Sequence, residues 1–266
     1  MNAASLDIRA GVAHDPAIPR ARRLRAYWTE ARYESVRMLR SPGFSIPFLG
    51  LPVLLYLLFA VLIAGAAAKN EPGVAPFLFT GFTVFGIVGP GMFGFGVIVA
   101  TEREQGLLRF KRALPMPSAA YLLAKVVMAV VFATIVMATM LAAGLTLGHL
   151  ALSIGQVLSV ALIGILGSVP FCALGFLIGV WTPARSAPAI VNLVYLPMLH
   201  LSGLFYPLPK VLKAMAPFWP AYHVQRLMFN AIGLSAEGGS VTHIAVLAGV
   251  TVLFGVLAVR RLAKVG

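Results

Sequence analysis

The chain is short of charged residues. Of its 266 residues only 11% are charged, whereas 60% are hydrophobic, and the mean hydropathy is +0.92. A water-soluble domain covers its surface with about a quarter charged residues. This composition therefore excludes a soluble protein and indicates an integral membrane protein with no room for a large extramembrane domain.

Acidic residues are especially scarce, with 8 Asp and Glu against 21 Lys and Arg. All of them fall outside the apolar segments or at their edges: Asp7, Asp15, Glu30, Glu34, Glu71, Glu102, Glu104 and Glu237. Ion-coupled carriers place carboxylates within the bilayer, so an ion-coupled transporter is a weak alternative. The basic excess does not indicate a nucleic-acid partner, because the uncharged runs are too long for such a domain.

Motifs of motors and enzymes are also missing. A phosphate-binding loop needs a Gly-Lys pair, and the chain has none. An intramembrane enzyme stays an alternative through Ser168 and His200, but the glycine that rhomboid-type proteases carry after the serine is absent. Cys172 is the only cysteine, so no intrachain disulfide is expected. The histidines show no pair at metal-ligand spacing, and no metal site is predicted: His14, His149, His200, His223 and His243.

What the chain does have is long apolar segments, each near or above the length that crosses a bilayer. They lie at 46–68, 74–100, 119–147, 153–180, 186–206 and 242–260. We therefore predict an all-α integral membrane protein with six transmembrane helices. With a cytoplasmic N-terminus, all but four basic residues lie on or near the cytoplasmic side, the exceptions being Lys69, Lys210, Lys213 and Arg226. The positive-inside rule then places both termini in the cytoplasm.

The N-terminal segment is predicted to be separate from the membrane domain. Residues 1–45 form a cytoplasmic segment and 46–266 the transmembrane domain. Between residues 24 and 39 apolar residues recur at helical spacing, with charged residues on another face. Such a helix lies in the headgroup plane, with its arginines on lipid phosphates. The alternative is an ordinary cytoplasmic helix packed on another chain.

Two further segments carry motifs. Residues 101–118 combine a charged helix end, a short helix with apolar residues among basic ones, and two prolines, which predicts a rigid cytoplasmic connection. The alternative is a solvated loop. Residues 204–240 are rich in proline and aromatic residues but too irregular for a span, which is typical of chain at the outer interface. A plain external loop is the alternative there.

These motifs resemble the ABC-2 type permeases, the membrane subunits of bacterial ATP-binding-cassette exporters. The first match is Glu102-Arg103-Glu104-Gln105-Gly106-Leu107-Leu108, followed by Pro115 and Lys125, with Leu107 in place of the usual Thr. The second is Leu201-Ser202-Gly203-Leu204-Phe205-Tyr206-Pro207, followed by Pro217, Trp219-Pro220 and Ala221-Tyr222-His223. The resemblance covers nearly all of residues 20–262.

The resemblance implies a half-transporter in the bacterial inner membrane. Two copies of the chain, or one copy and a homologous permease, would enclose a path, with two ATPase subunits beneath them. ATP and Mg would bind the ATPase, and no cofactor would bind this chain. Residues 204–240 would form short re-entrant helices, and 101–118 would form a coupling helix. The residues implied to contact the ATPase are Glu102, Arg103, Glu104, Gly106, Leu107, Leu108, Arg109 and Phe110.

The transport path is predicted along the second and fifth apolar segments, the second of which is expected to kink at Pro90. The candidate path residues are Phe82, Phe85, Pro90, Phe93, Asn192, Tyr195 and His200. Few groups there could bind sugar hydroxyls, which favours a hydrophobic or amphipathic small molecule of the multidrug-efflux type. A polysaccharide, glycolipid or lipid-linked cargo is the alternative. Gly175 and Gly179 are one turn apart and predict close helix packing, within the chain or across a dimer.

Overall fold

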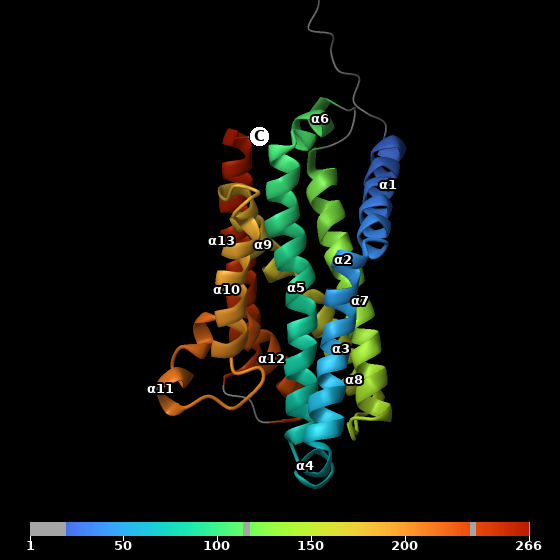
Figure 1. The fold of residues 1–266 in the computed structure, drawn as a ribbon, viewed down its shortest axis with the longest axis vertical. Coiled ribbons are helices and arrows are strands. Elements are labelled where there is room, and N and C mark those ends of the chain that lie inside the picture. Colours follow the sequence, from blue (N-terminus) through green and yellow to red (C-terminus); the bar gives the residue numbers. More distant parts are fainter. Residues whose placement is uncertain (1–19, 114–117, 235–237, 266) are drawn as a thin grey trace, which may run out of the picture.

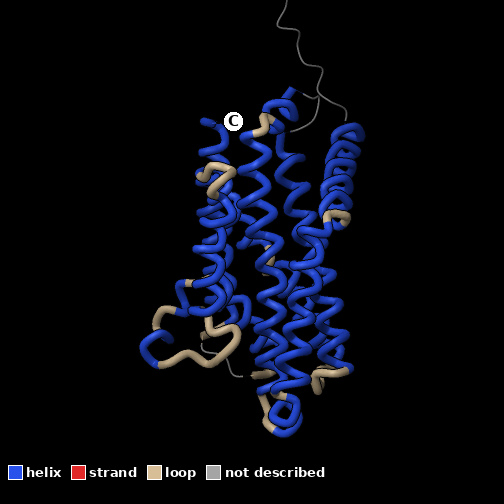
Figure 2. The backbone as a smooth tube through the Cα atoms, in the orientation of Figure 1, coloured by secondary structure: helices blue, strands red, loops and turns tan. Residues whose placement is uncertain are grey.

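The computed structural model describes residues 20–113, 118–234 and 238–265, and within these ranges every regular element is a helix (Figures 1 and 2). The long helices run along one common axis. The C-terminus, α1 (Arg20–Leu39) and α6 (Leu107–Ala113) lie at one end of the bundle, which we name the α6 end (Figure 1). The opposite end carries α4 (Gly65–Asn70) and is named the α4 end.

Five helical stretches are long and apolar enough to cross a membrane: Pro42–Ile63, Val74–Glu104, Ala119–Thr146, Ile154–Trp181 and Ser240–Leu262. The other predicted segment, 186–206, contains α10 (Ala187–Leu201), a helix of 15 residues. Its length of about 22 Å falls short of the hydrocarbon core of about 30 Å. A turn after Leu201, with Gly203 at φ +72°, ends it early. The all-helical prediction is confirmed for the described residues, and five of the six predicted segments correspond to helical stretches long and apolar enough to cross a membrane.

The first spanning stretch alternates between two kinds of helix. Its parts are α2 (Pro42–Ser45), the π-helix η1 (Ile46–Gly50), α3 (Leu51–Tyr56) and the π-helix η2 (Leu57–Ile63). Prolines 42, 47 and 52 recur every five residues; Pro42 begins the stretch, and Pro47 and Pro52 each remove a backbone donor from the ladder. Wide turns of the π type are the expected accommodation of such a ladder.

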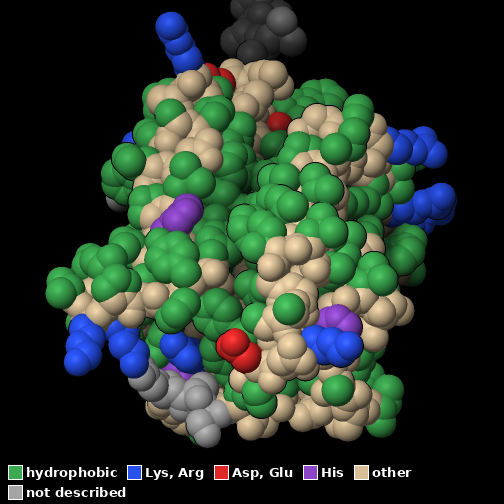
Figure 3. Space-filling view, turned by 60° about the horizontal axis from the view of Figure 1, so that its bottom comes forward, with side chains coloured by type: hydrophobic (Ala, Val, Ile, Leu, Met, Phe, Trp, Pro, Cys, Tyr) green, Lys and Arg blue, Asp and Glu red, His purple; other side chains and the backbone are tan. Residues whose placement is uncertain are grey.

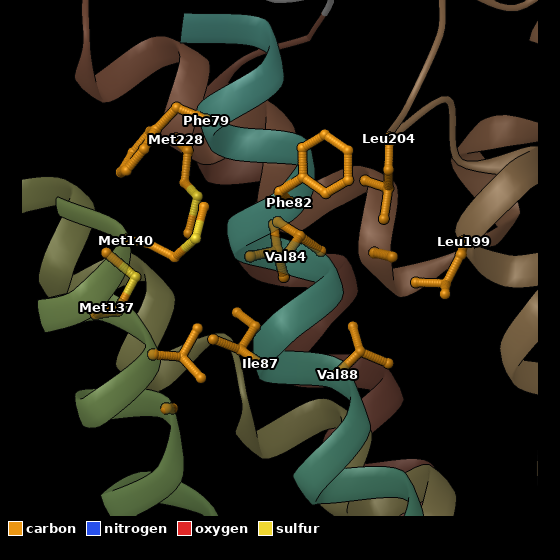
Figure 4. Packing of buried hydrophobic residues seen from close by; sticks show 14 of the residues in the cluster. Phe79, Phe82, Val84, Ile87, Val88, Met137, Met140, Leu199, Leu204 and Met228 are labelled. Atoms are coloured by element: carbon orange, nitrogen blue, oxygen red, sulfur yellow. The ribbon is translucent and has the colours of Figure 1, made fainter. Parts of the chain in front are cut away.

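Helix α5 (Val74–Glu104) is the centre of the bundle. It is assigned as one continuous helix that includes Pro90, and most of its residues are buried. Its side chains pack to both sides, with Ile87 toward Met137 and Val88 toward Leu199 (Figure 4). Helix α5 is therefore buried on several of its faces, whereas a helix at the edge of a bundle is buried on one.

Helix α9 (Val169–Trp181) packs directly on the backbone of α5. A Cβ atom at Gly175 would lie 2.7 Å from the Met92 carbonyl oxygen, and one at Gly179 would lie 2.5 Å from that of Phe95. Two glycines one turn apart therefore permit this close approach. The prediction that the pair serves packing within the chain is confirmed.

The predicted segment 153–180 consists of two helices, α8 (Ile154–Leu166) and α9, joined by Gly167 and Ser168. Helix α8 begins with a capping box between Ser153 and Gln156, in which each side chain bonds the backbone of the other. The break between α8 and α9 lies near the middle of the spanning stretch. It sets the two halves of this stretch against different neighbours, α7 (Ser118–Thr146) for α8 and α5 for α9.

The region 204–240 forms short helices at the α4 end: α11 (Lys210–Lys213), the 3₁₀-helix η3 (Ala216–Phe218) and α12 (Pro220–Ala231). Helix α11 projects sideways from the bundle (Figure 1). Helix α12 instead packs inside, against α5, α8 and α13 (Ser240–Val265). We predicted that residues 204–240 contain no full span, and the described residues of this region agree with that prediction.

Candidate functional site at the α6 end and along α5 and α10

Helix α1 runs beside the first half of α7 (Figure 1). Its buried face consists of Ala31, Glu34, Ser35 and Met38. Because a carboxylate lies at the centre of this face, hydrophobic burial alone does not hold α1 against α7. On this face α1 makes a contact within the chain, and its predicted place in the headgroup plane stays a prediction.

Lys125 on α7 lies between two carboxylates from other helices. Its Nζ atom is 2.7 Å from Glu34 Oε1 on α1 and 3.0 Å from Glu102 Oε2 on α5. The Lys125 side chain is 0% exposed. A buried ammonium is tolerated only when it is paired and hydrogen-bonded, and both conditions are met here.

Two more side chains complete this network, the buried Tyr121 and the half-exposed Arg37. Arg37 donates to Glu102 at 2.6 Å and to Glu34 at 2.9 Å, and the Tyr121 hydroxyl donates to Glu102 at 2.6 Å. Burial alone would lower the pKa of Arg37, but its hydrogen bond and charge interactions with the two glutamates outweigh burial and raise it. The two carboxylates and two cations neutralise one another, and they join α1, α5 and α7.

The residues Glu102, Arg103 and Glu104 contact three different neighbours at the end of α5. Glu102 belongs to the buried network. Arg103 donates to the carbonyls of Val180 and Thr182 at the end of α9, the latter at 2.9 Å. Glu104 accepts from the backbone N–H of Ala184, at 2.8 Å, in the turn before α10. The cation therefore satisfies carbonyls at a helix C-terminus, which favours positive charge.

Helix α6 is attached to this end by a glycine turn and one ion pair. Gly106 adopts φ +74°, a conformation suited to glycine, between α5 and α6. Lys111 pairs with Glu30 of α1. Leu108 is buried at 5% exposure, whereas Phe110 is 63% exposed. Helix α6 thus presents an exposed aromatic side chain on a base fixed to its neighbours.

The predicted partner surface stays a prediction, but its residues differ in how accessible they are. Glu102 and Leu108 face the interior, where neighbouring helices surround them. Their side chains are therefore not accessible to a second protein. Glu104 and Phe110 are exposed, and Arg103 is half-buried against α9. Gly106 and Leu107 are partly exposed, and the side chain of Arg109 lies outside the described part of the chain.

Five predicted path residues lie in one series of ring contacts on α5 and α10. The Tyr195 ring is 5.5 Å from that of Phe93 and 6.3 Å from that of Phe85. The series continues through Phe205, which is 5.8 Å from Phe85, 5.3 Å from Phe82 and 5.7 Å from His200. Phe205 was not among the predicted path residues, although it lies within the second motif.

The remaining two path residues take different positions. Asn192 is exposed on α10, two turns from His200 on the same face. The His200 Nδ1 atom lies 2.8 Å from the Leu196 carbonyl oxygen of its own helix, so Nδ1 donates the proton. Pro90 of α5 is buried, as are Phe82 on the same helix and Tyr195 on α10, and the place of these residues on the path stays a prediction.

The structure also brings together two histidines whose sequence spacing predicted no pair. His223 Nδ1 on α12 lies 2.8 Å from His243 Nδ1 on α13, and His223 Nε2 lies 2.8 Å from the Pro217 carbonyl oxygen. A carbonyl only accepts, so His223 donates from Nε2 and its Nδ1 accepts from His243. Burial and the neighbouring His243 lower the pKa of His223, despite the opposing effect of the Pro217 hydrogen bond.

The proposed pairing of Ser168 with His200 is not supported. The Ser168 hydroxyl is buried and donates to the Ile165 carbonyl at 2.7 Å, and His200 bonds to Leu196. Neither hydrogen bond joins the two side chains. In the described part of the chain, no group of three metal-ligating residues comes together.

The spanning helices and the buried central helix define a multi-pass helical membrane protein. With the molecule turned so that the α4 end comes forward, hydrophobic side chains cover much of the surface, and Lys and Arg side chains lie at its sides and across its lower part (Figure 3).

The chain belongs to the ABC-2 type transporter family, whose model matches residues 25–232. It is also similar to "Putative transport permease YvfS" of Bacillus subtilis (strain 168), with 27% identity over 235 residues. The match covers 86% of this chain and 94% of the relative. Family membership implies a transport subunit that works with an ATPase partner, and it confirms the predicted resemblance.

Proposed function

We propose that this chain is the membrane half of an exporter in the bacterial inner membrane, with two copies of the chain and two copies of a separate ATPase. The observation that carries the proposal is α6, a short helix with an exposed aromatic residue on a fixed base. The α6 end then faces the cytoplasm. Phe110 inserts into a groove of the ATPase, and Glu104 lies at the edge of that contact.

The contacts of α6 and of the end of α5 indicate how a movement of α6 would reach the other helices. Its ion pair with Glu30 ties α6 to α1, and the Arg103 and Glu104 contacts tie the end of α5 to α9 and α10. When ATP binding closes the two ATPase subunits, the two copies of α6 move together with these helices. The populations of inward-facing and outward-facing states shift accordingly.

The aromatic series on α5 and α10 is the proposed path surface between the two copies. It offers stacking and apolar contact, with Asn192 and His200 as polar groups at its border. Such a surface suits a hydrophobic or amphipathic small molecule, for which apolar contacts supply affinity and a few polar groups fix orientation. In this proposal the chain binds no nucleotide, and the partner ATPase binds ATP and Mg.

The test is the substitution Phe110→Ala. We expect association with the ATPase and ATP-dependent export from proteoliposomes to be lost, because an exposed aromatic anchor dominates such contacts. The matched control is Phe218→Ala, which removes an aromatic side chain that is 84% exposed at the α4 end. Normal association and export by the Phe110 variant would refute the assignment of α6. Thermal stability should be unchanged in both variants.

A further inference from the structure

A groove of 590 Å³ lies between α8, α9, α12 and α13, away from the α6 end and from the aromatic series. This volume is within the usual range for ligand sites, about 300 to 1,000 Å³. Its walls are mostly apolar, with Leu162 and Leu166 of α8 facing Ile244 and Leu247 of α13. The groove follows from the break at residues 167–168, because α9 packs along α13 whereas α8 packs on α7.

The groove has polar groups at its α4 end. There the Asn230 side chain donates to the Ser240 hydroxyl at 3.2 Å, where α12 ends and α13 begins. At the deep end Thr251 also lines the groove, but its hydroxyl donates to the Leu247 carbonyl of its own helix at 2.7 Å. The Thr251 hydroxyl is therefore already used within its helix, and the deep end offers mainly apolar contacts. The polar groups Asn230 and Ser240 lie at the other end, the α4 end.

The length of the groove equals the depth of one leaflet. From Ser240 to Thr251 the α13 wall rises about 16 Å, at about 1.5 Å per residue. Half of a hydrocarbon core of about 30 Å is nearly the same distance. Three of the four helices that form its walls, α8, α9 and α13, belong to spanning stretches, so we expect its open side to face the bilayer. Leu162, Leu166 and Ile244 are each more than half exposed there.

We propose that this groove binds one acyl chain of a phospholipid from the leaflet at the α4 end. The tail lies along α8 and α13 and ends near Thr251, and the ester and headgroup region contacts Asn230 and Ser240. A transmembrane helix of a second copy fits less well. Such a helix is about 10 Å wide and needs a wall through both leaflets, whereas this groove ends at mid-depth.

The test uses the full chain, without an ATPase, in lipid nanodiscs that contain phosphatidylethanolamine with a diazirine in the middle of one acyl chain. After irradiation, adducts are mapped by peptide mass spectrometry. We expect them to concentrate on 159–170 and 240–251. The Ala248→Trp variant fills the groove and should reduce these adducts severalfold. The Leu162→Trp variant, which enlarges a side chain on the opposite wall, should do the same.

The matched control is Ala245→Trp, since Ala245 is exposed on α13 but does not line the groove. It should label like the wild type. Equal labelling in all three variants and the wild type, or uniform labelling of all exposed helices, would overturn the proposal. So would efficient disulfide formation between two copies carrying Ala248→Cys, which would identify a second copy as the occupant. Because labelling needs no transport, its outcome is independent of the proposed function.

Discussion

The two ends of the bundle are held together by different chemistry. At the α6 end, Lys125 and Arg37 are paired with Glu34 and Glu102 in a buried network that joins three helices. At the α4 end, an imidazole pair, ring contacts and neutral hydrogen bonds connect α12 to its neighbours. The α6 end therefore depends on a balance of full charges, whereas the α4 end depends on uncharged contacts, of which the histidine pair is one.

The two ends are therefore sensitive to different changes. Removing one member of a buried ion network leaves an uncompensated charge, so the cost at the α6 end is large for a single substitution. Neutral hydrogen bonds contribute less each, but a histidine pair responds to pH near neutrality. Between the two ends, the glycine contact of α5 with α9 contains no charge and depends on space alone.

The largest expected effect comes from Lys125→Met. The two carboxylates that flank Lys125 would lose their shared cation, which costs about 3 to 5 kcal/mol when a buried pair is broken. The measurement is the free energy of unfolding in mixed micelles titrated with denaturing detergent. The control is Lys111→Met, because the Lys111 pair is less buried, and it should cost about 1 kcal/mol or less.

A double variant sharpens this test. Glu102→Gln with Lys125→Met removes one charge of each sign and leaves Glu34 with Arg37, so part of the lost stability should return. If the double variant is as unstable as the sum of its two single variants, the charges do not interact as described.

The next effect in size is expected for Gly179→Ala. The new methyl group would lie 2.5 Å from the Phe95 carbonyl oxygen, so α9 must move away from α5. Overpacking of this kind costs about 1 to 3 kcal/mol. Gly249→Ala is the matched control on α13, where nothing lies within 4 Å, and it should be neutral or stabilising by up to about 1 kcal/mol. Equal effects in both variants would show that the α5 and α9 contact is not tight.

The smallest effect is expected at the α4 end and depends on pH. The pKa of His223 in the folded chain lies below its ordinary value of 6.5. As pH falls below this value, the unfolded chain takes up a proton before the folded chain does, so stability is full above it and declines through the lower folded pKa. The melting temperature of the wild type should therefore fall further between pH 8 and pH 5 than that of His223→Gln.

The control for this prediction is His200→Gln, which changes an exposed histidine outside the pair. It should keep the pH dependence of the wild type. A wild-type profile that matches His223→Gln would mean that the histidine pair does not contribute to the stability of the α4 end.

Much of the fold could be predicted from the sequence because the membrane selects long apolar helices, and hydropathy reports them directly. The glycine contact of α9 was predictable for a similar local reason, since Gly175 and Gly179 are one turn apart. The break between α8 and α9 was not predicted, because Gly167, Ser168 and Pro170 lie inside a run whose hydropathy stays high. Hydropathy reports burial in lipid, not the continuity of a helix.

The candidate site was predictable in position but not in its contacts. The charged residues at the end of the second span identified the α6 end, yet the partners of Glu102 come from α1 and α7. Glu34 was expected near the membrane surface because helical periodicity gives no information about a partner 91 residues away. The histidine pair was missed for the same reason, because His223 and His243 belong to different helices, α12 and α13.

The buried network also constrains the order in which the chain can assemble. Glu34 is synthesised 91 residues before Lys125, and both precede the final helices. At about 5 to 20 residues per second, α1 must wait for several seconds or longer before its cation exists. During that interval its carboxylate stays in contact with water. Helix α1 can dock only after α7 has been inserted, so the first helix that the structure describes reaches its final place no earlier than α7 does.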